Sequence, residues 1–279
     1  MAKRGAVTRF APSPTGLLHL GHAHSALFAH ALAGEGGRFL LRIEDIDRGR
    51  CRPEFQAAIH EDLAWLGLRW EAGVRRQSEH MADYARALDA LDGMGLVYPC
   101  FCTRAEIRAE IVRSGAAPHG PDGPLYPGTC RGLADAAARV AAGESHALRL
   151  DMGRAVARAG PLAWHDRGRG RVAARPEIFG DAVLARKDTP TSYHLAVTVD
   201  DAIQGVSLVT RGADLFQATH VHRLLQALLG LGVPEYRHHR LLADDKGQRL
   251  AKRHDSLAIR RLRERGYTAD EVRAMAGIG

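Results

Sequence analysis

The chain of 279 residues lacks any run of 18 apolar residues, and its start, Met-Ala-Lys-Arg, is not followed by the apolar core of a signal peptide. The first absence excludes a membrane-spanning helix and the second excludes a secretory signal, so we expect a cytoplasmic protein with no membrane partner. Cysteine is scarce too, with four residues. Because thiols remain reduced in the cytoplasm, we expect free thiols rather than disulfides.

The composition instead describes a large, basic globular protein. Hydrophobic residues make up 46% of the sequence, enough for a sizeable core, and the length suits two domains, with one inserted in the other as an option. Lysine and arginine number 39 against 32 aspartate and glutamate residues, which gives a net charge of +7 beside 15 histidines. Such a surface attracts polyanions, and RNA is the natural candidate.

A strand, a tight turn and the start of a helix are predicted in residues 7–33. Residues 7–10 have strand character, two prolines and a glycine end the strand, and residues 23–33 are good helix formers, which puts His19 and His22 near the helix start. The positive end of a helix attracts a triphosphate, and Gly21 lets adenine or ribose approach the backbone. The imidazoles can donate to phosphate oxygens, so the segment indicates a nucleotide site.

The segment from Pro12 to His22 resembles the first signature, the "HIGH" box, of the class I aminoacyl-tRNA synthetases, and the preceding run from Arg9 resembles their glutamate branch. The resemblance implies that His19, Gly21 and His22 bind ATP, together with magnesium, and that the two histidines are catalytic. A nucleotidyltransferase with a similar box, acting on a small metabolite, is the nearest alternative.

A basic segment near the C-terminus, Arg249 to Arg253, resembles the second signature of the same family, the "KMSKS" loop. It departs from that pattern, because Arg249 stands at the first lysine and Ala251 at the serine, which removes a hydroxyl contact to phosphate. Lys252 keeps the lysine at the most characteristic position of this signature. The resemblance implies that Lys252 binds ATP and takes part in catalysis by stabilising the leaving pyrophosphate.

Two further stretches combine an apolar strand with acidic residues. Residues 39–43 predict a strand with Glu44 at its carboxyl end, where open α/β sheets bind ligands. Residues 193–199, followed by Asp200 and Asp201, show the same strand-then-acid pattern, and residues 206–215 predict another strand that ends in a charged turn. Segments around 55–66 and 81–91 have the periodicity of amphipathic helices.

The resemblance to the glutamate branch implies a glutamate pocket on these elements. Glu44 would hold the amino group, and Arg9 and Arg211 would clamp the carboxylates. Bidentate pairing favours glutamate over glutamine, because an amide cannot accept two charge-assisted hydrogen bonds. The residues implied for this pocket are Arg9, Phe10, Ala11, Pro12, Ser13, Glu44, Tyr193 and Arg211.

Three of the four cysteines lie close together in the sequence. Two are separated by one residue, and the third follows a tyrosine by four positions, at the end of a stretch, residues 114–130, that holds four glycines and four prolines. By spacing alone, a structural zinc site and three unrelated buried thiols both stay open. The resemblance to glutamyl-type synthetases implies one structural zinc ion on Cys100, Cys102, Tyr126 and Cys130. His119 and Cys51 are rival fourth ligands.

We expect an α/β fold, a doubly wound parallel-sheet nucleotide-binding domain of Rossmann-like, class I synthetase type, interrupted by a second domain. Residues 1–97 would form the first half of the catalytic domain, 98–188 a zinc-binding insertion of acceptor type that contacts RNA, and 189–240 the second half. Residues 241–279 would hold the second signature and a short helical segment. Residues 167–171 predict an exposed basic turn within the insertion.

Only 26 residues follow Arg253, too few for an anticodon-binding domain, so we expect none. This length, with the glutamate-type motifs, resembles short paralogues of glutamyl-tRNA synthetase. These ligases activate L-glutamate with ATP and transfer it to the queuosine base in the anticodon of tRNA(Asp). By the same resemblance we expect a monomer. A short glutamyl-tRNA synthetase that charges a tRNA 3′ end and a non-catalytic RNA-binding paralogue stay open as alternatives.

Overall fold

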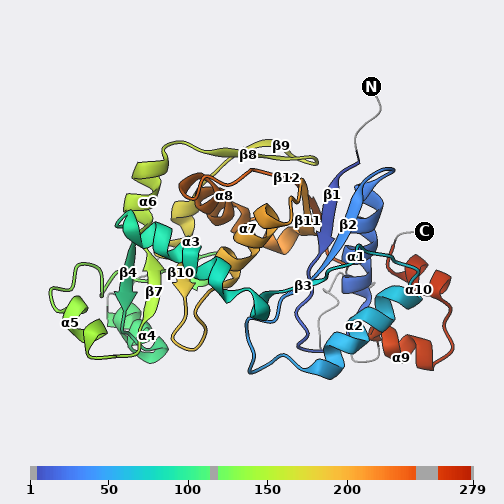
Figure 1. Ribbon diagram of the computed structural model, residues 1–279, viewed down its shortest axis with the longest axis horizontal. Helices are drawn as coiled ribbons and strands as arrows, with labels where there is room; N and C mark the ends of the chain where they lie inside the picture. Colours follow the sequence, from blue (N-terminus) through green and yellow to red (C-terminus); the bar gives the residue numbers. More distant parts are fainter. Residues whose placement is uncertain (1–4, 114–118, 243–256, 278–279) are drawn as a thin grey trace.

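The computed structural model describes residues 5–113, 119–242 and 257–277 (Figure 1). A first group of three parallel strands has the order β1-β2-β3. Their bounds are Val7–Phe10, Arg38–Ile43 and Arg75–Arg76. The strands predicted at 7–10 and 39–43 are therefore confirmed, and β2 ends directly before Glu44.

A second group of four strands continues this layer in the order β11-β12-β8-β9. Their bounds are Leu208–Gly212, Glu235–His239, Ala163–Asp166 and Gly170–Ala173. β11, β12 and β8 are parallel, and β9 returns antiparallel to β8. The two groups meet where the backbone N–H of Ser207 donates to the carbonyl of Val7 at 3.0 Å, so β1 lies beside β11. This parallel arrangement agrees with the expected α/β class.

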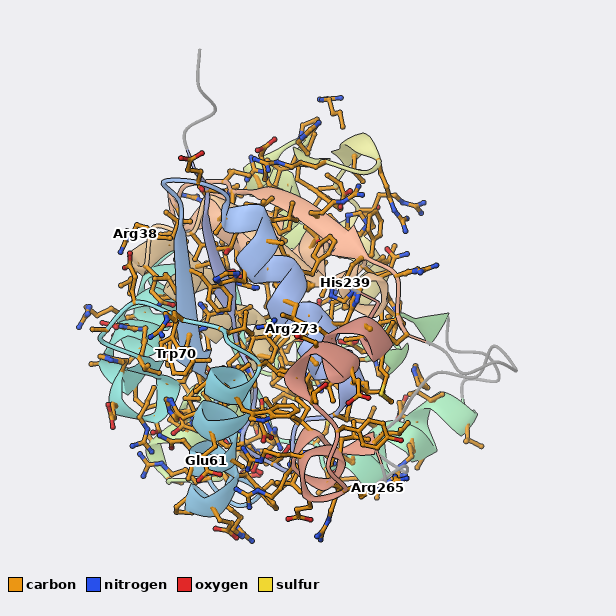
Figure 2. The ribbon with its side chains drawn as sticks, turned by 90° about the vertical axis from the view of Figure 1, so that its right-hand side faces the viewer. Arg38, Glu61, Trp70, His239, Arg265 and Arg273 are labelled. Atoms are coloured by element: carbon orange, nitrogen blue, oxygen red, sulfur yellow. The ribbon has the colours of Figure 1, made fainter. Side chains whose placement is uncertain are left out.

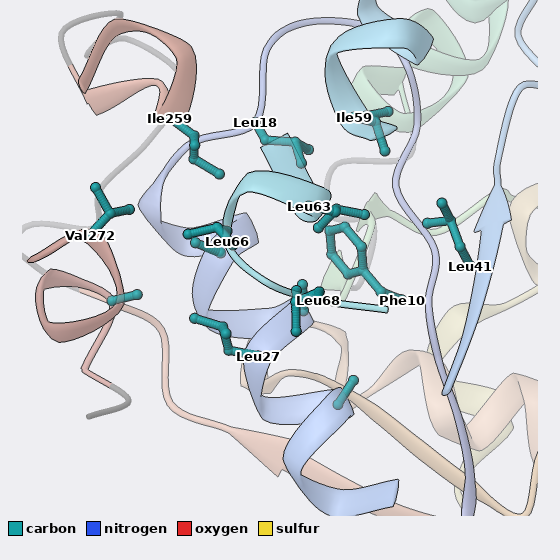
Figure 3. Packing of buried hydrophobic residues seen from close by; sticks show 14 of the residues in the cluster. Phe10, Leu18, Leu27, Leu41, Ile59, Leu63, Leu66, Leu68, Ile259 and Val272 are labelled. Atoms are coloured by element: carbon teal, nitrogen blue, oxygen red, sulfur yellow. The ribbon is translucent and has the colours of Figure 1, made fainter. Parts of the chain in front are cut away.

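One apolar core lies between the first strands and four helices (Figure 3). The helices are α1 (Leu20–Ala33), α2 (Pro53–Trp65), α9 (Ile259–Glu264) and α10 (Ala269–Met275). Phe10 and Leu41 from the strands meet Leu63 of α2, and Ile259 and Val272 reach the same core from the C-terminal helices. Burial of these side chains therefore holds the end of the described chain against its beginning.

A second core lies among four other helices and the neighbouring strands. These helices are α3 (Met81–Gly93), α6 (Met152–Ala159), α7 (Tyr193–Ile203) and α8 (Ala218–Leu228). The helices predicted around 55–66 and 81–91 correspond to α2 and α3 and are confirmed. None of the helices in the described ranges combines the length and apolar character needed to cross a lipid bilayer.

A separate antiparallel sheet lies at the far left of Figure 1, in the order β10-β7-β4. Its strands are Val183–Ala185, Ala147–Leu150 and Val97–Cys100, and the elements around it are α4 (Arg104–Arg113), α5 (Ala136–Ala141), β5 (His119–Gly120) and β6 (Gly123–Pro124). Short 3-10 turns occur at Gln77–Glu79, Pro176–Phe179 and Ala213–Leu215. These elements fall within the stretch 98–188 that the sequence assigns to an insertion, apart from the start of β4 and two of the turns.

The basic turn predicted at residues 167–171 is the tip of the hairpin between β8 and β9. This hairpin pairs with β12 rather than with the outlying sheet, because Asp166 lies opposite Tyr236 in a parallel bridge. Part of the stretch 98–188 thus extends the sheet of the second strand group.

The strand expected at residues 193–199 is wrong, since these residues begin helix α7, Tyr193–Ile203. The Oγ of Ser192 accepts from the backbone N–H of Leu195 at 3.4 Å and caps the helix. Residues 195–201 are all buried, polar ones included, so this helix has almost no solvent-exposed face. A short apolar run of this kind has no periodicity by which to separate a buried helix from a buried strand.

Candidate active site

The start of α1 holds the two predicted imidazoles together. His19 is the N-cap residue, and its Nδ1 accepts from the backbone N–H of Gly21 at 3.1 Å, while Nδ1 of His22 accepts from the backbone N–H of His19 at 3.2 Å. The two rings lie 3.9 Å apart between centroids. A Cβ on Gly21 would lie 3.0 Å from the His19 ring, so any larger residue here would press on the capping imidazole. The positive end of α1 therefore carries two ordered imidazoles.

The chain next to the C-terminal helices is attached to this turn. Ala258 forms an antiparallel bridge with His19, and the backbone N–H of Ile259 donates to the carbonyl of Leu18 at 2.8 Å. The second signature, Arg249 to Arg253 with Lys252, lies outside the described residues. Of the described residues on either side of it, Ala258 pairs with His19 of the first signature, and Leu242 lines the cavity that adjoins this signature.

A cavity of about 640 Å³, here called the inner cavity, lies between α1, β1, β11 and α7. Every residue predicted for the glutamate pocket lines it, and so do His19, Gly21 and His22. The predicted residues on its wall are Arg9, Phe10, Ala11, Pro12, Ser13, His19, Gly21, His22, Glu44, Tyr193 and Arg211. The structure thus brings together side chains that are more than 200 positions apart in the sequence.

Arg211 is buried in the wall of the inner cavity, with 6% of its surface exposed. Its guanidinium donates from Nε to His238 at 3.2 Å, from Nη1 to His222 at 3.1 Å and from Nη2 to Thr219 at 2.5 Å. Burial, reinforced by Arg211, lowers the pKa of His238 to about 4 and that of His222 well below its ordinary value. All three partners are therefore neutral, and within the described residues no carboxylate pairs with Arg211 directly. The nearest carboxylate in this network, Asp166, lies behind His238 and accepts from its Nδ1 at 2.6 Å.

Arg9 is equally buried but belongs to a network of opposite charges. Its Nε donates to Asp201 at 2.9 Å and its Nη1 donates to the carbonyl of Thr210 at 3.0 Å. Asp201 also accepts from the fully buried Arg42 at 2.8 Å, and Arg42 pairs with Glu44 at 3.2 Å. Burial opposes ionisation of Asp201, but Arg9 and Arg42 outweigh it and lower the pKa of that carboxyl. This end of the cavity is therefore closely balanced in charge.

Glu44 points a carboxylate into the same cavity, with 12% of its side chain exposed. Burial raises its pKa above the ordinary value, while Arg42 and Arg9 act in the opposite direction. A bound ammonium group would favour the ionised form further, because an opposite charge at short range stabilises a buried carboxylate.

Several side chains on this wall, or behind it in contact with its arginines, were not predicted. His222, His238 and Thr219 hold Arg211, and Asp201, predicted only as part of an acidic pair, holds Arg9. At the other end the wall includes Ser25 and His239, whose Oγ and Nε2 lie 3.1 Å apart, and Figure 2 shows His239 beside α1. Histidine-rich segments at 219–223 and 237–240 are the only sequence signal for these residues, and the signal does not say which ring faces a ligand.

The predicted metal ligands converge at a separate place, beside the antiparallel sheet. The Sγ atoms of Cys100, Cys102 and Cys130 all lie within 4.8 Å of one another, and the hydroxyl of Tyr126 lies 3.4 Å from the first and 3.7 Å from the second. Three thiols and a phenol on one centre suit the tetrahedral N/S/O preference of zinc. Cys51 lies elsewhere, in a shallow depression beside α2, so it is wrong as a fourth ligand.

Comparison with known proteins agrees with this geometry. The family described as tRNA synthetases class I (E and Q), catalytic domain, matches residues 6–276. The chain belongs to this family. A protein of Rhodobacter capsulatus named glutamyl-Q tRNA(Asp) synthetase is 49% identical over 278 residues, which cover 98% of this chain and 100% of that protein. A protein of the same name from Nitratidesulfovibrio vulgaris is 44% identical, with 95% of this chain and 83% of that protein covered.

The chain is thus similar over nearly its whole length to proteins named glutamyl-Q tRNA(Asp) synthetase. Among solved structures, a glutamate tRNA ligase from Elizabethkingia meningosepticum in complex with its amino acid aligns with a TM-score of 0.74 and 27% identity. The alignment covers 94% of this chain and 53% of that ligase, so the chain spans about half of its length. The shared part is the class I synthetase catalytic domain, which agrees with the parallel sheet.

Proposed function

We propose that this protein is a ligase that activates L-glutamate with ATP to glutamyl-adenylate and then transfers glutamate to the queuosine base at the wobble position of tRNA(Asp). The observation that carries the amino-acid step is Arg211, a buried cation on the wall of the inner cavity whose partners are all neutral. The names of the most similar relatives support the RNA substrate.

In the proposed complex, Arg211 pairs with one substrate carboxylate, because a buried cation gains most from an anion that also accepts bidentate hydrogen bonds. Glu44 receives the ammonium group, and Arg9, held in place by Asp201, is the second arginine of the proposed carboxylate clamp. The wall from Phe10 to Ser13 encloses the ligand. An amide at the side-chain end would leave the charge of Arg211 unbalanced, which favours glutamate over glutamine.

ATP is proposed to bind at the α1 end of the cavity. The imidazoles of His19 and His22, held by their Nδ1 atoms at the positive end of the helix, would donate to its phosphates, while Gly21 leaves room beside the backbone. Lys252 of the second signature would stabilise the pyrophosphate as it leaves. Magnesium bound with ATP would neutralise phosphate charge.

The α-carboxylate of glutamate then attacks the α-phosphorus, a new P–O bond forms, and the bond to pyrophosphate breaks. No side chain has to act as a nucleophile, so the protein contributes position and electrostatic stabilisation. We also propose that Cys100, Cys102, Tyr126 and Cys130 hold one structural zinc ion, which would fix the loop between them.

The remaining predictions belong to the same proposal. Residues 1–97 and 189–240 are proposed as the two halves of the catalytic domain, 98–188 as the insertion that contacts RNA, and 241–279 as the second signature with its following helices, without an anticodon-binding domain. The net charge of +7 suits a polyanionic partner. We propose that the protein acts as a monomer in the cytoplasm.

Two measurements test the proposal. Purified protein should exchange labelled pyrophosphate into ATP in the presence of glutamate and no other amino acid, and Lys252→Ala should abolish most of this exchange. Labelled glutamate should then appear on queuosine-containing tRNA(Asp), and nuclease mapping should locate it in the anticodon loop. Label on the 3′-terminal adenosine would instead establish the short glutamyl-tRNA synthetase.

A further inference from the structure

A second cavity of about 420 Å³, here called the outer cavity, adjoins the inner one. Tyr193 lines both cavities. The outer cavity lies between the start of α7, the hairpin β5-β6 and β10, and Arg104, Arg149, Arg186 and His194 are on its wall. Asp122 and Asp181 lie on the same wall, and the three guanidinium groups there can pair with the phosphates of a bound nucleotide chain.

A chain of polar contacts links Arg211 of the inner cavity to the outer cavity. Nη1 of Arg211 lies 3.1 Å from Nδ1 of His222, and Nε2 of His222 lies 3.1 Å from Nδ1 of His194. Nε2 of His194 lies 3.5 Å from a carboxylate oxygen of Asp122, on the turn of the hairpin β5-β6. The chain therefore runs from the amino-acid pocket, past Tyr193, to the wall of the outer cavity.

The direction of each hydrogen bond is fixed by Arg211. A guanidinium can only donate, so Nδ1 of His222 accepts and the proton of that neutral ring lies on Nε2. Nε2 then donates to Nδ1 of His194, which places the proton of His194 on its own Nε2. His194 thus presents an N–H donor to the outer cavity, where its partner in the structure is the carboxylate of Asp122, whose side chain is 72% exposed.

Packing keeps the two imidazoles in place. His222 is 3% exposed, and its ring lies edge-on to that of His194 at 5.3 Å between centroids. Phe179 lies edge-on to His194 on the other side at 5.5 Å, and Tyr193 contacts both imidazoles at 5.6 Å. Because burial keeps the pKa of His222 well below its ordinary value, the ring stays neutral and continues to accept from Arg211.

We propose that His194 is a positioning residue for the transfer step: its Nε2–H hydrogen-bonds an oxygen of the acceptor nucleotide in the outer cavity, with its tautomer set through His222 by Arg211. This inference rests on the proposed function. The acceptor hydroxyl oxygen forms a bond to the glutamyl carbonyl carbon, the bond from that carbon to the adenylate phosphate oxygen breaks, and the departing AMP phosphate takes the hydroxyl proton. His194 keeps its own proton throughout and acts through orientation.

Two substitutions separate the nitrogens of His194. In His194→Asn the amide group is placed near the position of Nδ1, so it can accept from His222 but no longer reaches the outer cavity. In His194→Gln the amide is placed near Nε2, so a donor faces the outer cavity while the contact to His222 is lost. Variants that change these two contacts in opposite ways distinguish a positioning role from packing.

We expect His194→Asn to slow single-turnover transfer from preformed glutamyl-adenylate to queuosine-containing tRNA(Asp) by about tenfold, as for the loss of one oriented hydrogen bond, with a smaller change in the KM for glutamate in pyrophosphate exchange. For His194→Gln we expect the larger effect on glutamate binding, because His222 loses its contact with residue 194 and holds Arg211 less firmly. The KM for glutamate should rise several-fold, and the transfer rate should fall less than in His194→Asn.

His80→Asn is the matched control, since His80 is a partly exposed histidine that lines neither cavity and lies outside residues 98–188. It should leave both steps within about twofold of the wild type. Equal changes in both steps for the two His194 variants, or unchanged transfer in His194→Asn, would overturn the relay. Failure of the wild-type protein to transfer glutamate to this RNA would instead overturn the proposed function.

Discussion

Arg9 and Arg211 are two arginines of the same cavity, each 6% exposed, and they differ in what surrounds the charge. Arg9 faces Asp201, which it shares with Arg42, so its charge is balanced within the protein. Arg211 faces two imidazoles and a hydroxyl. The sequence predicts that both arginines clamp the substrate carboxylates, and the difference in their partners leads us to propose Arg211 as the stronger contact of the two.

Neutral partners explain how such a site can exist before its ligand arrives. Imidazole and hydroxyl acceptors satisfy the N–H groups of Arg211 without neutralising its charge, which avoids unpaired donors and still leaves an electrostatic demand for an anion. An aspartate at the position of His222 or His238 would compete with the substrate carboxylate.

Asp201→Ala tests the charge balance around Arg9. Removal of this carboxylate leaves Arg9 and Arg42 buried without their shared partner, so the free energy of unfolding should fall by about 3–5 kcal/mol. Urea denaturation measures the change. Asp188→Ala, at a carboxylate that is 70% exposed, is the control and should change it by less than about 1 kcal/mol. A similar small loss in Asp201→Ala would mean that the network contributes little to the fold.

Arg211→Ala tests the arginine whose direct partners are all neutral. It should lower kcat/KM for glutamate in pyrophosphate exchange by roughly 100- to 1,000-fold, because the substrate carboxylate would be buried without its cation. The free energy of unfolding should fall by less than in Asp201→Ala. Arg158→Ala removes an exposed charge of α6 and controls for net charge. If exchange persists at the wild-type level, the anion binds elsewhere.

The cluster of Cys100, Cys102 and Cys130 differs from both arginine sites, because here three groups that can all become negative lie together without a cation among them in the described part of the chain. Burial raises the pKa of the Cys130 thiol, but hydrogen bonds from Tyr126 and neighbouring groups outweigh it and lower the pKa to about 7. Metal analysis should find about one zinc ion per chain, and prolonged chelation should lower the free energy of unfolding by about 2–4 kcal/mol. Cys130→Ser should lose the metal and Cys51→Ser should keep it. Retention of zinc by both variants would refute the proposed ligand set.

Asp62 of α2 is a buried acid whose negative charge has no hydrogen-bonded cation among the described residues. Its side chain is fully buried, its nearest cation, Arg263, is 3.9 Å away, and neither carboxylate oxygen accepts a hydrogen bond within the described residues. Burial raises its pKa from 3.8 to about 6. The unfolded chain therefore loses this proton first, and the stability contributed by the group declines as pH rises from about 4 to 6.

Asp62→Asn should accordingly raise the free energy of unfolding at pH 7.5 by about 1–2 kcal/mol, and the difference from wild type should vanish near pH 4. Denaturation at both pH values measures this. Asp89→Asn, on the exposed face of α3, supplies the control. A variant that is less stable than wild type at the higher pH would show that the carboxylate is stabilised by partners other than Arg263.

The sequence predicts the parts of the site that are local. The cap formed by His19 and Gly21 depends on residues two positions apart, and Glu44 follows a strand of ordinary composition, so both could be predicted from the chain alone. The partners of Arg211 could not, because His222 and His238 reach it from a helix and a strand with no local pattern that aims them there. The error at Tyr193 is of the same kind, since tertiary burial there hides the helical periodicity.

The ion network of Arg9, Arg42 and Asp201 joins residues about 160 to 190 positions apart, across the whole intervening segment. A ribosome therefore releases both arginines long before their carboxylate has been synthesised. Until α7 emerges, Arg9 and Arg42 lack the carboxylate that they share, although β1, β2 and α1 can already pack on one another. The ion network at this end of the inner cavity is therefore completed only after more than two thirds of the chain has been synthesised.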